Sequence, residues 1–218
     1  MGGCYCTEGV SQTAVAWFSE LKDTKIRRLS LRVGRIGGMN YYGAKELAAS
    51  FRTVRNNTIT IAEEIPEDKY GYQPAPGTRT VGHTLAHIAL STNMQQEIHA
   101  AKLTSLVGFD FMSFMRAAAL EQEKPRTKAQ IIQLLRENGD RYAAWVEGLS
   151  DDFLGQVVTM PPGGQPASRT RFDMLLSAKE HEMHHRGQLM LVERMLGITP
   201  HLTRHMQERM AQAANQKP

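Results

Sequence analysis

The sequence has little cysteine, no long apolar run and only a small excess of charge of one sign. Two cysteines among 218 residues are too few for the disulfide framework of a small secreted domain. No stretch approaches the roughly 20 consecutive apolar residues of a membrane-spanning helix, so we expect no membrane span. Lys and Arg exceed Asp and Glu by 26 to 22, which gives a formal net charge of +4.

Most of this excess charge lies at the N-terminus. Residues 1–35 hold six of the 26 basic and three of the 22 acidic residues, which leaves 20 basic and 19 acidic residues for positions 36–218. Residues 1–38 also lack the basic segment followed by an apolar stretch that forms a secretory signal. We therefore predict a weakly ordered N-terminal extension over 1–38 of a cytoplasmic protein. We expect no nucleic-acid binding by the nearly neutral remainder.

After residue 39, apolar residues recur at three- and four-residue steps, which is the pattern of amphipathic helices. Caps and breakers divide this region into four long helices. We expect them from about residue 40 to Pro66, from a cap at Thr78 or Thr80 to about Leu103, from a capping box at Thr127 to about Gly148, and from about Thr170 to about Leu196.

Four amphipathic helices with no strand-rich region predict an all-α fold, a four-helix bundle over residues 39–200. A long loop over 149–169 precedes the last helix and contains at most a short strand, at 156–160. We expect the Phe- and Met-rich connection at 109–115 to form a short helix or a lid. Residues 201–218 are predicted to form a short helix and a tail.

Two pairs of histidines stand four residues apart, one on the second predicted helix and one on the fourth. Because residues four apart lie on one face of a helix, both rings of a pair can reach one ion. On the fourth helix the pair shares its face with positions expected in the core. A buried neutral imidazole needs partners for both ring nitrogens, and a metal ion supplies one of them. The pairs are His83 with His87 and His181 with His185, and the shared stripe is Met174, Ala178, His181, His185, Gln188 and Val192.

Residues 181–185 also match the His-Glu-x-x-His motif of zincin proteases. The longer metzincin pattern fails, because Gln188 and Leu191 stand where it requires Gly and a third His. Glu182 lies about 100° around the helix from His181, so we expect it to face away from the ion. A diiron carboxylate centre needs two Glu-x-x-His motifs, and only Glu182 with His185 has that spacing. We therefore favour neither class.

Residues 80–89 (TVGHTLAHIA) resemble the second-helix signature of the DinB-like family of metal-binding four-helix bundles. Residues 181–189 (HEMHHRGQL), followed by Leu-Gly at 196–197, resemble its fourth-helix signature. The resemblance implies that His87, His181 and His185 bind one divalent ion. Members of the family are often dimers, so the resemblance also implies a homodimer. Family members with established activity include thiol-dependent S-transferases and a mycothiol-dependent isomerase. His83 stands where the family often has an acidic or neutral residue, and it is a fourth ligand, a proton carrier or a surface residue.

Three neutral histidines leave positions open on a divalent ion, as in catalytic sites. Such an ion lowers the pKa of a bound water or thiol. We therefore predict a metal-dependent enzyme that acts on a small molecule by thiol transfer or hydrolysis, with zinc, nickel or iron as the ion. Neither cysteine lies in the matched region, so a thiol would come from a low-molecular-weight cosubstrate. The alternative is a non-catalytic bundle that binds a metal or another ligand, and no residue is indicated as a catalytic base.

Overall fold

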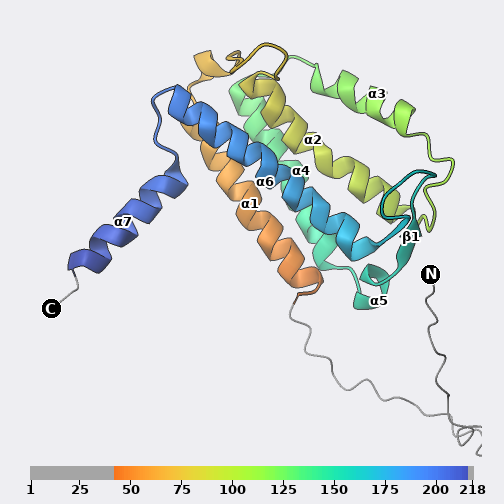
Figure 1. Ribbon diagram of the computed structural model, residues 1–218. Coiled ribbons are helices and arrows are strands. Elements are labelled where there is room, and N and C mark those ends of the chain that lie inside the picture. Colours follow the sequence, from red (N-terminus) through yellow and green to blue (C-terminus); the bar gives the residue numbers. More distant parts are fainter. Residues whose placement is uncertain (1–41, 216–218) are drawn as a thin grey trace, which may run out of the picture. The chain divides into compact units, whose positions relative to one another are not determined.

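Four long helices form the body of the protein. The computed structural model describes residues 42–215. Each long helix packs against two others, so that the helices form a closed ring (Figure 1). The ring contains, in order, α1 (Ala44–Glu64), α4 (Lys128–Glu147), α2 (Val81–Ala100) and α6 (Arg171–Met195). This arrangement confirms the predicted all-α four-helix bundle.

The connections contain shorter elements. The predicted short strand is present, but it pairs with a second strand that the sequence did not indicate; the two are antiparallel, with Val157 opposite Thr170. The helix expected in the Phe- and Met-rich connection is present, and the last helix ends at Asn215. None of the described helices is long and apolar enough to cross a membrane. These elements are η2 (Glu67–Lys69), α3 (Phe111–Gln122), α5 (Asp151–Leu154), β1 (Val157–Thr159), β2 (Ser168–Thr170) and α7 (His201–Asn215).

The extension predicted over residues 1–38 lies outside the described residues, and so do the last three residues of the predicted tail.

Threonine caps fix where three of the long helices begin. Thr80, rather than Thr78, caps α2 and accepts a hydrogen bond from the backbone N–H of His83. Thr127 forms the predicted capping box with Gln130, and Thr170 caps α6. An N-cap oxygen satisfies a backbone donor that the helix itself leaves unpaired. These caps set the register of α2 and α6, and therefore the positions of their histidines.

The core face of α6 differs from the predicted stripe. Gln188, which we expected to face inward, is exposed, whereas Leu189 is 1% exposed. Glu182 is completely buried, and His181 is only half-buried. The centre of the buried face thus lies about one residue later than the sequence pattern suggested. The pattern of apolar residues did not reveal this shift, because a buried glutamate takes one of the core positions.

A buried ion pair joins the four helices at the centre of the bundle. The Nε of Arg55 on α1 lies 2.9 Å and 3.0 Å from the two carboxylate oxygens of Glu182 on α6. The same guanidinium donates to the carbonyl oxygens of Leu135 on α4, at 2.7 Å, and of Ile88 on α2, at 3.3 Å. Both side chains are almost fully shielded from solvent. Arg55 therefore contacts every other helix of the ring with its charged group.

Gly139 on α4 leaves the space that this arginine needs. A β-carbon at position 139 would lie 2.8 Å from Cγ and 2.9 Å from Nη1 of Arg55. Because the guanidinium is held by hydrogen bonds on three sides, Arg55 has little freedom to move away. The close approach of α4 to Arg55 therefore requires glycine at this position.

We expect Glu182→Ala to lower the free energy of unfolding by about 3–5 kcal/mol, because it leaves the Arg55 charge buried without a partner. The measurement is urea unfolding in the presence of a chelator, which removes any contribution from a bound ion. Glu180→Ala, at an exposed position of the same helix, is the control and should change stability by less than about 0.5 kcal/mol. Equal effects of the two substitutions would contradict the structural role of the pair.

Gly139→Ala should destabilise the protein by about 1–3 kcal/mol, the usual cost of overfilling a packed core. Gly187→Ala is its control, because Gly187 lies on α6 and a β-carbon there has no neighbour within 4 Å. That substitution should stabilise by about 0.5–1 kcal/mol, the difference in helix propensity between Ala and Gly. Thermal unfolding of both variants tests the prediction, and a more stable Gly139→Ala variant would refute it.

Candidate metal centre

The three histidines selected from the sequence converge at one point between α2 and α6. His181 Nε2 lies 3.0 Å from His87 Nε2 and 3.1 Å from His185 Nε2. The ligand atoms of the three residues all lie within 4.8 Å of one another, and among the described residues they form the one such group of His, Cys, Asp or Glu. The structure thus brings the residues together, and their role as ligands stays a prediction.

Two glutamines orient the rings of this cluster. The Nδ1 of His87 lies 3.2 Å from Oε1 of Gln122, and the Nδ1 of His185 lies 2.8 Å from Oε1 of Gln188. An amide oxygen only accepts hydrogen bonds, so with the amides in this orientation each Nδ1 carries the proton and donates it. The Nε2 atoms of His87 and His185 therefore present lone pairs toward His181.

This assignment of protons leaves the cluster one hydrogen short. Two lone pairs, on His87 and His185, face the single Nε2 of His181, which can donate at most one hydrogen. At least one pair of ring nitrogens then has lone pair facing lone pair in a half-buried site, which is unfavourable. A cation among the three Nε2 atoms would accept all three lone pairs at once. The donor set therefore fits a divalent metal ion that binds imidazole nitrogen, such as zinc, nickel or iron.

The histidines are held in the form that binds metal. Burial lowers the pKa of His87 and His181 to about 4, and it also lowers the pKa of His185. The neighbouring histidines and the positive charge of Arg79 act in the same direction. Because only the neutral imidazole donates a lone pair to a metal, no proton has to leave these rings near neutral pH.

No carboxylate among the described residues belongs to the cluster. Glu182 faces away from the histidines, as expected, and it points to Arg55 in the bundle core. It is therefore not placed as the general base of a zincin protease, and the described part of the chain brings no pair of glutamates to the cluster for a diiron centre. The His-Glu-x-x-His motif therefore has a different role for its glutamate here, which forms an ion pair in the core and does not face the site.

The other histidines of these two motifs lie outside the cluster. His83 is exposed in the first turn of α2, so the structure places it as a surface residue and does not add it as a fourth ligand. His184 is exposed on α6, and its Nε2 accepts a hydrogen bond of 3.1 Å from the amide of Gln188. Gln188 therefore connects His184 with His185.

Sequence reasoning missed both glutamines. Gln188 stands one turn after His185, so its spacing could have indicated a partner for that ring. Gln122 is the last residue of α3, 35 positions after His87, and no local pattern relates the two. Arg126 holds this end of α3 by donating to the backbone oxygen and the carboxylate of Glu121.

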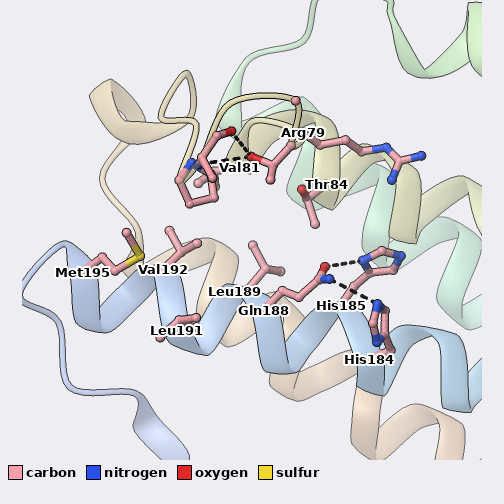
Figure 2. A pocket seen from close by; sticks show the side chains of 14 residues that line it. Arg79, Val81, Thr84, His184, His185, Gln188, Leu189, Leu191, Val192 and Met195 are labelled. Carbon is pink, nitrogen blue, oxygen red and sulfur yellow. Dashed lines mark hydrogen bonds between the residues drawn. The ribbon is translucent and has the colours of Figure 1, made fainter.

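One histidine of the cluster lines a pocket. His185 belongs both to the three converging histidines and to the wall of a cavity of about 920 Å³. The cavity lies between α6 and the loop that precedes α2 (Figure 2). A small molecule in this cavity could therefore contact His185, whereas His87 and His181 are not part of the cavity wall.

Gln122→Ala and Gln188→Ala should each lower metal affinity by about 10- to 100-fold, because they remove the acceptor that fixes a histidine tautomer. The measurement is competition for zinc with a chromophoric chelator at constant pH. Gln133→Ala, on the exposed surface of α4, is the control and should keep the affinity of the unmodified protein. Unchanged affinity in both glutamine variants would show that these side chains do not support the site.

Comparison with known proteins agrees with the fold and the motifs. The sequence model of the DinB superfamily matches residues 50–189, a segment that contains the three histidines. YjoA of Bacillus subtilis strain 168, an uncharacterized protein, is 23% identical over 158 residues, which cover 72% of this chain and 92% of YjoA.

Three solved structures share the fold. That of YjoA, a DinB-like protein, has a TM-score of 0.52 at 23% identity and covers 71% of this chain and 94% of YjoA. A DinB-like protein from Bacillus cereus ATCC 10987 has a TM-score of 0.54 at 16% identity, with coverages of 72% and 94%. YfiT from B. subtilis, described as a probable metal-dependent hydrolase with an unusual four-helix bundle topology, has a TM-score of 0.57 at 15% identity, with coverages of 72% and 89%. Because the family match spans well over half of the sequence and includes both histidine motifs, the chain belongs to the DinB superfamily.

Proposed function

We propose that this protein is a divalent-metal-dependent enzyme that acts on a small molecule, by hydrolysis or by transfer of a thiol. The observation that carries the proposal is the position of His185, which is shared by the histidine cluster and the pocket wall. Structural metal sites are usually closed by four protein ligands, whereas three ligands beside a cavity leave room for a reactant. A divalent ion bound there would supply a Lewis acid that lowers the pKa of a water or thiol.

The protein's own residues have separable tasks in this proposal. His87, His181 and His185 would hold the ion through Nε2. Gln122 and Gln188 keep the proton on Nδ1 of two of these rings and fix their orientation. This arrangement needs no proton release from the ligands when the ion binds, since burial already keeps the imidazoles neutral.

The pocket wall offers few groups that could move a proton. Among the described residues that line it there is no Asp or Glu, and apart from the candidate ligand His185 their one imidazole is that of His184. An imidazole can accept and return a proton near neutral pH. If the reaction needs a base from the wall, His184 is the side chain placed to provide it.

Different observations favour hydrolysis and thiol transfer. The description of YfiT as a probable metal-dependent hydrolase favours hydrolysis, whereas the resemblance to thiol-dependent S-transferases favours transfer. Both cysteines of the sequence, Cys4 and Cys6, lie outside the described residues, so the described site would take its thiol from a cosubstrate. A small-molecule ligand also suits residues 36–218, whose basic and acidic residues nearly balance.

His181→Ala should reduce the metal content from about one ion per chain to nearly none, because His181 contacts both other ligands. Elemental analysis of protein purified without a histidine tag measures the content, and circular dichroism checks that the helices persist. His184→Ala is the matched control on the same helix and should retain the ion. Unchanged metal content in His181→Ala would refute the site.

Removal of the ion by chelation separates an enzyme from a non-catalytic bundle. An enzyme whose ion is catalytic should stay folded after the ion is removed by chelation. It should lose turnover of p-nitrophenyl esters, or of an electrophile with a low-molecular-weight thiol, and recover it when zinc, nickel or iron is added. A bundle that unfolds on chelation and turns over neither substrate when loaded would instead have a structural ion.

A further inference from the structure

The pocket beside the candidate metal centre has a charged end and an apolar end. Its wall combines the loop over residues 74–79, the start of α2 and one face of α6. His185 and Met195 lie ten residues apart on α6, so the wall extends about 15 Å along that helix. Figure 2 shows the two ends, with Arg79, His184 and His185 at one and Leu191, Val192 and Met195 at the other.

Arg79 gives the first end an unbalanced positive charge. No carboxylate of the described residues forms an ion pair with it, and the pocket wall contains no acidic side chain. Its side chain extends toward the end of the pocket where His185 lies (Figure 2).

An unpaired guanidinium at a pocket wall is suited to one kind of ligand group. It presents planar N–H donors that match a carboxylate or phosphate, with which it forms charge-assisted hydrogen bonds. A ligand cation would find no acidic side chain to bind at this wall. Arg79 is exposed and hydrated in the free protein, and an anionic group is the ligand group that can replace this water with a charge-assisted hydrogen bond.

The other end of the pocket exposes large apolar side chains. Leu191 is 60% exposed and Met195 is 51% exposed, although both lie beside the buried Leu189 and Val192. Apolar surface in a concave wall gains free energy when an apolar ligand displaces the water that covers it. The apolar end therefore favours a hydrocarbon or aromatic group at a distance from the charged end.

We propose that the pocket binds an elongated small-molecule anion, with its carboxylate or phosphate group at Arg79 and its apolar body along Leu191 and Met195. This inference rests on the proposed function, because it describes the substrate class of the same site. Binding in this direction would bring the polar end of the molecule beside His185. Arg79 acts as a specificity-determining residue and takes no part in holding the ion.

Calorimetric titration with three eight-carbon probes tests the proposal on the full-length, metal-loaded protein. Octanoate should bind more tightly than 1-octanol, and octylamine should bind most weakly. Arg79→Gln should raise the dissociation constant of octanoate by about fivefold, the size expected for a partly exposed charged hydrogen bond. It should change that of 1-octanol by less than about twofold, since the alcohol carries no charge. Arg79→Lys should recover part of the octanoate affinity.

Two further variants separate charge from apolar contact. Arg209→Gln removes one positive charge from the exposed surface of α7, outside the pocket wall, and should leave all three affinities unchanged. Leu191→Ser should weaken octanoate and 1-octanol by a similar factor, because both probes have the same hydrocarbon chain. Equal affinity of the unmodified protein for the three probes would overturn the proposal.

Repeating the titrations after chelation distinguishes this inference from the proposed function. A preference for octanoate that persists without metal and disappears in Arg79→Gln supports the anion site, even if the protein proves not to be a metalloenzyme. A preference that disappears with the metal and is insensitive to Arg79→Gln means that the carboxylate binds the ion, which overturns the role of Arg79.

Discussion

The ion pair between Arg55 and Glu182 is the constraint on which the arrangement of the four helices depends. A buried charge is tolerated only when it is paired and its remaining donors are satisfied, so the bonds from Arg55 to α2, α4 and α6 allow little freedom in how the helices pack. Glu182 must point to the bundle axis, and this fixes the rotation of α6. His181 and His185 then lie about 100° and 60° from Glu182, on the same side of the helix. The core pair therefore turns both histidines toward His87.

The candidate metal centre follows from that rotation together with the tautomers of its rings. Because Gln122 and Gln188 accept from Nδ1, the Nε2 lone pairs point inward and cannot all be satisfied by hydrogen bonds among the histidines. A cation at this point would satisfy all three lone pairs at once. This donor arrangement adds to the closeness of the three imidazoles as a reason to infer a metal, since histidines with free choice of tautomer can often satisfy one another.

Much of this could be predicted from the sequence, because the relevant signals are local. Apolar spacing and threonine caps predicted the ranges of the long helices, and the four-residue spacing predicted that His181 lies beside His185. The signal failed where a charged residue occupies a core position: Glu182 displaced the expected core face by about one residue, so that Gln188 was wrongly placed inward. Pairings across the fold, such as Arg55 with Glu182 or His87 with Gln122, join residues with no periodic relation. The pairing of β1 with β2 likewise joins two segments that no periodic pattern relates.

Helix α3 gives the site a further property. It has no buried residue and packs mainly against α2, so little apolar contact holds it in place, and segments of this kind open locally at low free-energy cost. Its last residue, Gln122, nevertheless bonds to a ring of the histidine cluster. Whatever orders His87 also favours the docked position of α3, and by thermodynamic reciprocity the docked helix favours the ordered ring. A weakly attached helix of the described chain is thus coupled to the state of the histidine cluster.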